Sequence, residues 1–152
     1  MYVLYTDVFS ITSPVSAFDA PTVSAWRAWV HLNQNLLYFS VVTVMEVRFG
    51  IEMARHRGAT QKARRLEEWL LAAETVHRER LIPVSSDIAH RAGALLHRAV
   101  TEGVTPSTED ALIAASAEIR GFAVLSRNGK HMRALTDHWF DPLDLLPPSS
   151  RA

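Results

Sequence analysis

Short apolar segments alternate along the chain with longer segments that carry an apolar face at helical spacing. The apolar segments cover residues 1–4, 36–40, 81–84 and 122–125, and each has the length of a buried strand. Strands separated by amphipathic helices indicate a parallel sheet, because each helix returns the chain to the edge where the next strand begins. The pattern predicts an α/β fold in which a short parallel central sheet is flanked by helices.

Capping residues predict where the helices begin. Ser24 is expected to cap the first helix, and Thr43 the second, with Glu46 three residues later at capping-box spacing. Thr108 is expected to cap a later, alanine-rich helix that stops before Gly121.

Two segments are predicted to lie at the sheet edges. Pro83 lacks a backbone N–H, so the strand at 81–84 belongs at an edge, and residues 139–142 are expected to form a last edge strand. Residues 1–145 are predicted to form a single domain, and residues 146–152, which are rich in Pro and Ser, a flexible tail.

The bulk composition excludes several classes of protein. The 152 residues contain no cysteine, so disulfides and thiolate metal sites are excluded. The formal net charge is zero, so any grip on nucleic acid needs a local patch. No secretory signal and no apolar run of about 20 residues, the length that spans a bilayer, is found. A cytoplasmic location without membrane contact is predicted.

Four polar side chains follow predicted strands or begin predicted helices: Asp7, Glu46, Asp110 and Asn128. In open parallel sheets, functional sites form beyond the carboxyl ends of the strands, so these side chains are expected to converge. Carboxylates that converge repel one another unless a cation lies between them, and Mg²⁺ prefers oxygen ligands. Such a metal activates water and stabilises the charge of a cleaved phosphodiester.

Each of these residues also has an ordinary structural explanation. Glu46 has capping-box spacing, and Asp110 is a first-turn acid that complements the helix dipole. Asp7 suits a turn or a cap, and Asn128 precedes a glycine as in many turns. The functional interpretation therefore depends on the set and its placement.

Four segments together resemble the PIN-domain family, in particular VapC-type toxins. YTDV at residues 5–8 stands where those toxins carry Asp-Thr-Asn-Val, and SVVTVME at 40–46 matches their Ser-Val-Val-Thr-x-x-Glu. DALIAA at 110–115 matches the third motif letter for letter. SRNGKHM at 126–132 matches the fourth, Thr-Arg-Asn-x-x-Asp-Phe.

The resemblance implies a single PIN-like domain that is an Mg²⁺-dependent endoribonuclease toxin, with Mn²⁺ as a second suitable metal. It also implies an RNA substrate, a cognate VapB-like antitoxin and a homodimer. The catalytic and metal-binding residues that it implies are Glu46, Asp110 and, as a substitute, Asp7. The supporting polar residues are Thr6, Thr43 and Asn128.

Two positions depart from the family pattern. Tyr5 replaces the first metal-binding aspartate, and His131 replaces the acid after Asn-x-x. Three explanations remain open: Asp7 takes over as ligand, Tyr5 is an introduced inactivating change, or the chain is a naturally degenerate member that only binds RNA or antitoxin. His131 is a weak Mg²⁺ ligand and a better one for Mn²⁺ or Zn²⁺, or else an ordinary loop histidine.

Two further groups of side chains allow a binding or a structural interpretation. A basic stretch either contacts RNA or an acidic partner, or forms a solvated helix pair with acidic neighbours. Several aromatic residues either form core or line a groove for a partner helix. The basic residues are Arg48, Arg55, His56, Arg57, Lys62, Arg64 and Arg65, and the aromatic ones are Trp26, Trp29, Trp69 and Phe49.

Overall fold

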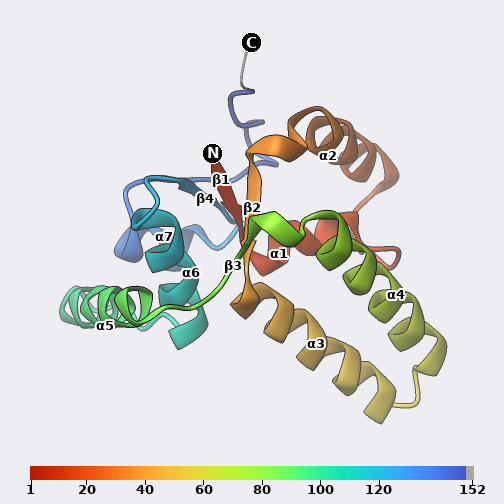
Figure 1. Cartoon of the computed structure of the whole chain (residues 1–152), viewed down its shortest axis with the longest axis horizontal. Coiled ribbons are helices and arrows are strands. Elements are labelled where there is room, and N and C mark those ends of the chain that lie inside the picture. Colours follow the sequence, from red (N-terminus) through yellow and green to blue (C-terminus); the bar gives the residue numbers. More distant parts are fainter. Residues whose placement is uncertain (150–152) are drawn as a thin grey trace.

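The computed structural model describes residues 1–149, and its centre is one parallel sheet with the strand order β3-β2-β1-β4-β5 (Figure 1). The predicted α/β fold is confirmed. The strands are β1 (Tyr2–Leu4), β2 (Leu37–Ser40), β3 (Leu81–Ile82), β4 (Ala123–Leu125) and β5 (Trp139–Phe140). β3 and β5 lie at the edges, as predicted for the segments at 81–84 and 139–142.

Helices cover both sides of the sheet, with α5, α6 and α7 on one side and α1 to α4 on the other (Figure 1). The helices are α1 (Thr6–Phe9), α2 (Ala20–Asn33), α3 (Val41–His56), α4 (Thr60–Val76), α5 (Ser86–Thr101), α6 (Thr108–Glu118) and α7 (Gly129–Leu135). Short 3₁₀ turns are η1 (Ser10–Thr12), η2 (Gln34–Leu36) and η3 (Arg78–Arg80).

The central strand β1 is buried on both faces, and this fixes where the following residues point. Val3 and Tyr5 pack in the core on the α5–α6–α7 side, while Tyr2 and Leu4 pack in the core on the other side. Alternation along a strand produces this division. The side chain of Tyr5 is therefore directed toward α6.

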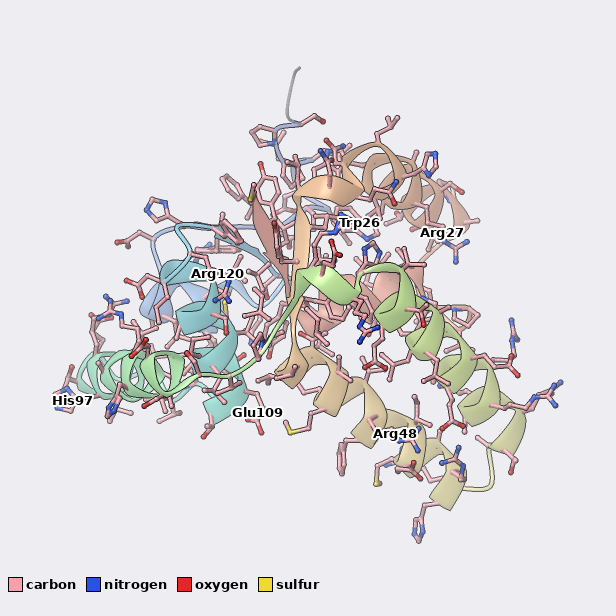
Figure 2. All side chains as sticks on the ribbon, viewed as in Figure 1. Trp26, Arg27, Arg48, His97, Glu109 and Arg120 are labelled. Carbon is pink, nitrogen blue, oxygen red and sulfur yellow. The ribbon has the colours of Figure 1, made fainter. Side chains whose placement is uncertain are left out.

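The α2 side of the sheet is filled largely by aromatic rings. Trp26 and Trp29 are buried and stack with their ring centroids 5.2 Å apart, and Tyr2 meets Trp29 edge to face. Figure 2 shows Trp26 on α2, which lies over this part of the sheet. Of the two interpretations of these tryptophans, the structure supports core.

Three predicted helix caps were wrong, by five residues for Ser24, three for Thr43 and one for Thr108. α2 begins at Ala20 behind Asp19, α3 begins at Val41 behind Ser40, and α6 begins at Thr108 behind Ser107. In each case an earlier side chain already accepts a hydrogen bond from the first turn, which leaves Ser24, Thr43 and Thr108 inside the helix. The segment Leu81–Val84 is also shorter as a strand, because pairing ends before Pro83.

The carboxyl-terminal residues that the structure describes contact the domain. The indole of Trp29 donates to the carbonyl of Pro147 at 3.0 Å, and the hydroxyl of Tyr2 donates to that of Pro148 at 2.8 Å. The predicted boundary at residue 145 stays a prediction, and residues 150–152 of the predicted tail lie outside the described residues. Within residues 1–149, no helix combines the length and the apolar character that crossing a membrane requires.

Candidate active site

The carboxyl ends of three neighbouring strands lie level in the middle of the sheet. Leu4 of β1 is in register with Phe39 of β2 and with Leu125 of β4. The backbone N–H of Tyr5 then donates to the carbonyl of Leu125 at 2.9 Å, which holds the residue after β1 against the end of β4. Residues just beyond these strands therefore start from neighbouring positions at this edge of the sheet.

Asp110 enters this place from the first turn of α6. Its backbone N–H donates to Oγ of Ser107 at 3.0 Å, and its Oδ2 accepts from the backbone N–H of Ser107 at 2.9 Å. This reciprocal pair is a capping box, and it holds the carboxylate in one orientation. The residue is only 2% exposed, so its remaining partners must come from the protein.

The two altered family positions supply those partners. The hydroxyl of Tyr5 donates to Oδ1 of Asp110 at 2.5 Å, and Nδ1 of His131 lies 2.6 Å from Oδ2. Burial, and then the hydrogen bond to Asp110, raise the pKa of Tyr5 far above its ordinary value, so the phenol stays protonated as the donor. Tyr5, Asp110 and His131 thus form one connected network around a buried carboxylate.

Glu46 lies beside this network on the second turn of α3. Its Oε2 accepts from the hydroxyl of Thr6, which begins α1 directly after β1. Burial raises the pKa of Glu46, the Thr6 hydroxyl opposes that shift, and the charges of Glu109 and Asp110 add to it. Glu46 therefore lies near enough to Asp110 for the two charges to interact. The capping-box explanation of Glu46 was wrong, because Ser40 caps α3.

Asp7 takes part in a different set of contacts. Its Oδ2 accepts from the backbone N–H of Arg127 at 3.0 Å, so it ties α1 to the turn after β4. Its Oδ1 is buried and has no hydrogen-bond partner among the described residues. Burial raises its pKa to about 6, with the Arg127 N–H opposing this shift. Asp7 is not hydrogen-bonded to the Asp110 network.

Of the other predicted supporting residues, Asn128 joins the Asp110 network and Thr43 does not. Asn128 lies in the network, since its Nδ2 is 3.0 Å from Nδ1 of His131. Thr43 is fully buried, and its hydroxyl donates to the carbonyl of Leu4 at 3.4 Å, so it holds α3 against β1. Among the described residues Thr43 makes no hydrogen bond to a carboxylate, so it joins α3 to β1 rather than supporting an acid.

The side chains around Asp110 and Glu46 do not match the ligand set of a bound divalent cation. Both oxygens of Asp110 accept from protein groups, one oxygen of Glu46 accepts from Thr6, and a phenol stands where the family has an acid. The described residues hold no group of three or more His, Asp or Glu side chains arranged for a metal ion. Asp7 keeps one unpartnered oxygen, but its other oxygen is bound to the backbone at Arg127.

The charged residues of α3 and α4 pair mainly with one another. Arg48 and Arg55 both bind Glu67, and Arg55 also binds Glu52 at 2.7 Å. Figure 2 shows Arg48 near the middle of α3, on the side toward α4. For these two arginines the structure favours the solvated helix pair over an unpaired RNA-binding patch.

A pocket of about 600 Å³ lies between the segment from α1 to Phe18 and the α3–α4 pair. Thr6 and Glu46 line it, and so do Phe49, Leu66 and Trp69. Phe49 is 68% exposed, an unusual state for a phenyl ring. The acidic site is thus continuous with a larger, partly apolar surface.

Sequence reasoning missed the role of Ser107 and the pairing of Tyr5 and His131 with Asp110. Ser107 carried a signal, because Ser-x-x-Asp is a capping-box spacing. The pairing had none in the local sequence, since the partners lie 105 and 21 residues from Asp110.

Three comparisons with known proteins point to the same family. The PIN domain family model matches residues 11–136. VapC ribonuclease Y4jK of Sinorhizobium fredii is 32% identical over 130 residues, which are 84% of this chain and 87% of that protein. The crystal structure of FitAcB from Neisseria gonorrhoeae has a TM-score of 0.80 at 26% identity and covers 95% of this chain and 100% of its own.

A more distant structure shares the fold alone. VapBC2 from Rickettsia felis, bound to a DNA fragment from their promoter, has a TM-score of 0.64 at 17% identity, over 92% of this chain and 98% of its own. Together the matches confirm the resemblance inferred from the four motifs.

Proposed function

The chain belongs to the PIN domain family, and from that premise we propose that it is a ribonuclease toxin of the VapC type. One observation carries the proposal: Glu46 and Asp110, from the two most specific motifs, are neighbours where the carboxyl ends of β1, β2 and β4 meet. The similar protein from Sinorhizobium fredii is described as a ribonuclease, which supports RNA as the substrate.

The role of Mg²⁺ or Mn²⁺ stays a prediction from the resemblance. Hydrogen bonds from Tyr5 and Ser107 already engage Asp110, and they disfavour a resident cation there. We therefore assign no step of the reaction to a metal ion.

The test is cleavage of total bacterial RNA by the purified chain, with new ends mapped by sequencing. Glu46→Gln keeps the Asp110 network and removes one carboxylate, so cleavage should fall at least about 100-fold if Glu46 moves a proton. Glu102→Gln, an exposed acid just after α5, is the matched control and should cut like the parent chain. Equal cutting by Glu46→Gln and the parent would refute the assignment.

A second candidate, favoured by the Tyr5 hydroxyl on Asp110, is a catalytically impaired PIN domain that binds RNA or an antitoxin. This candidate gains if no new RNA ends appear while a filter-binding assay detects RNA or a co-expressed antitoxin co-purifies. It fails if the chain cuts RNA and Glu46→Gln does not.

For the antitoxin we propose the pocket between α1 and the α3–α4 pair as the docking surface. One protein of similar fold is described as a member of the VapBC family of toxin–antitoxin systems and another as a toxin–antitoxin complex. Exposed Phe49 offers an aromatic anchor beside Glu46. Phe49→Glu should abolish co-purification of an antitoxin encoded beside this gene, whereas Leu32→Glu, on the exposed face of α2, should not. The homodimer and the cytoplasmic location stay predictions.

A further inference from the structure

We propose that a cavity between α2, α4 and the sheet is a binding site for a small neutral aromatic molecule that carries a hydroxyl group. The cavity has a volume of about 250 Å³ and lies in the aromatic core on the α1–α4 side of the sheet. α6, which carries Asp110, lies on the opposite side (Figure 1). The inference therefore goes beyond the proposed ribonuclease function and does not depend on it.

Aromatic rings form much of the cavity wall. Phe9 stacks with Phe39 at a centroid distance of 5.2 Å, and it meets Trp69 at 4.6 Å. His77 lies edge-on to Phe39 at 6.0 Å, and Trp26 also lines the cavity. Aromatic rings pack favourably against other rings in offset or edge-to-face contacts. A planar aromatic occupant therefore fits this wall.

The volume of the cavity limits the size of the occupant. A cavity of about 150 Å³ in another protein admits benzene, and sites for drug-sized molecules begin at about 300 Å³. At about 250 Å³, this cavity suits one ring with short substituents or two fused rings. Val76 lines the cavity and is 63% exposed, so the cavity reaches the surface beside the end of α4.

Two side chains of the wall each carry a buried polar atom without a partner. Nε1 of Trp26 and Nδ1 of His77 make no hydrogen bond within residues 1–149. Trp26 is only 1% exposed, so bulk solvent does not satisfy its N–H. Buried polar atoms without partners are destabilising, and native structures normally supply a partner. A molecule bound in the cavity would supply it here.

A hydroxyl group matches both of these atoms. The indole N–H of Trp26 only donates, so its partner must be an acceptor. Burial, and then the charge of Arg80, lower the pKa of His77, which keeps the ring neutral near pH 7. Nδ1 of a neutral imidazole accepts or donates according to the tautomer, and a hydroxyl can do either in return.

The cavity wall also excludes a charged occupant. Among the described residues that line it, none is Asp, Glu, Lys or Arg. An ionised ligand would lose its hydration without gaining a counter-charge, which is costly. A neutral phenol avoids this cost and still offers the hydroxyl.

The experiment titrates the full ¹⁵N-labelled chain with 4-methylphenol, and separately with toluene as the matched probe without a hydroxyl, and follows the indole N–H signals by NMR. Trp26→Phe identifies the Trp26 signal. We expect 4-methylphenol to shift this signal and to leave that of Trp139, which packs against the core on the other side of the sheet. Its Kd should be at least about 10-fold lower than that of toluene, the gain that one hydrogen bond provides.

Three variants test the location and the polar contact. Ala73→Leu fills the cavity from α4 and should abolish binding of both probes, whereas Ala94→Leu, exposed on α5, is the matched control and should bind like the parent. His77→Phe keeps a ring and removes Nδ1, so the preference for 4-methylphenol should fall to less than about 3-fold. Circular dichroism identifies any unfolded variant, and partly exposed His77 keeps the test valid if Ala73→Leu unfolds.

Four results would overturn the inference. One is the lack of a saturable shift of the Trp26 signal at millimolar 4-methylphenol. Another is equal affinity for the two probes, which would remove the role of the hydroxyl. A shift that persists in folded Ala73→Leu would place the probe elsewhere. A crystal structure with 4-methylphenol that shows only water beside Trp26 and His77 would assign those atoms to solvent. None of these results bears on RNA cleavage, so the ribonuclease proposal is tested separately.

Discussion

The hydroxyl of Tyr5 should stabilise the fold measurably, because it donates to a buried charged acceptor. Tyr5 is 9% exposed and Asp110 is 2% exposed, so no water replaces the donor in a Tyr5→Phe variant. A hydrogen bond to a charged group contributes about 1.5–3 kcal/mol. We expect Tyr5→Phe to lower the free energy of unfolding by about 2 kcal/mol.

Two other tyrosines provide a graded comparison. Tyr2 donates to the neutral carbonyl of Pro148 at 2.8 Å, so Tyr2→Phe should lose only about 1 kcal/mol. The hydroxyl of Tyr38 has no hydrogen bond among the described residues, so Tyr38→Phe should lie within about 0.5 kcal/mol of the parent chain.

The assay is urea unfolding followed by tryptophan fluorescence, with thermal unfolding as a second measure. For a chain of this size, 2 kcal/mol corresponds to a fall in Tm of about 4–8 °C. A Tyr5→Phe variant as stable as Tyr38→Phe would refute the idea that Tyr5 serves a buried carboxylate.

Two further changes test the surroundings of the site. Burial raises the pKa of Asp7 to about 6, so the folded chain binds this proton more tightly than the unfolded chain; stability is greatest with Asp7 protonated and is lost as the pH rises toward and through 6. Asp7→Asn should therefore be more stable than the parent by about 1–3 kcal/mol at pH 7.5, and urea titrations should show the gap closing by pH 4; a gap that is absent at pH 7.5 would contradict this reasoning. A Cβ on Gly129 would lie 2.8 Å from Trp139, so Gly129→Ala should destabilise the chain by about 1–3 kcal/mol in urea. Gly50→Ala meets nothing within 4 Å inside α3 and should be stabilising by up to about 1 kcal/mol, and the reverse order of the two variants would contradict the packing at α7.

The sheet and its helices were predictable because their signals are local and periodic. Residues 1–4 are apolar throughout, as a strand buried on both faces requires, and Pro83 marked an edge. The convergence of Glu46 with Asp110 followed from a rule about the carboxyl ends of parallel strands. These inferences needed no knowledge of contacts between distant residues.

Helix starts and the small helices were harder to predict, because neighbouring residues compete for the same role. Ser40 and Thr43 are both good caps, and the choice depends on where β2 ends. Gly129 follows an asparagine and looked like part of a turn, yet it begins α7, where the ring of Trp139 packs against it.

The pairing of Tyr5 and His131 with Asp110 could not be predicted from the sequence, since it arises from tertiary contacts alone. Each looked like the loss of a family acid. In the fold each binds the carboxylate of Asp110, so two separate departures become one network. No local sequence pattern shows that a tyrosine or a histidine will lie beside a buried carboxylate from a distant part of the chain.

The most direct test of this network is a crystal structure of the chain grown with Mn²⁺, with data collected at the manganese absorption edge. We predict that Tyr5 Oη stays about 2.5 Å from Oδ1 of Asp110, with Nδ1 of His131 on Oδ2, and that the pocket shows no anomalous peak. An anomalous peak between Glu46 and Asp110, with the Tyr5 hydroxyl displaced, would contradict the account and restore the metal chemistry of the family.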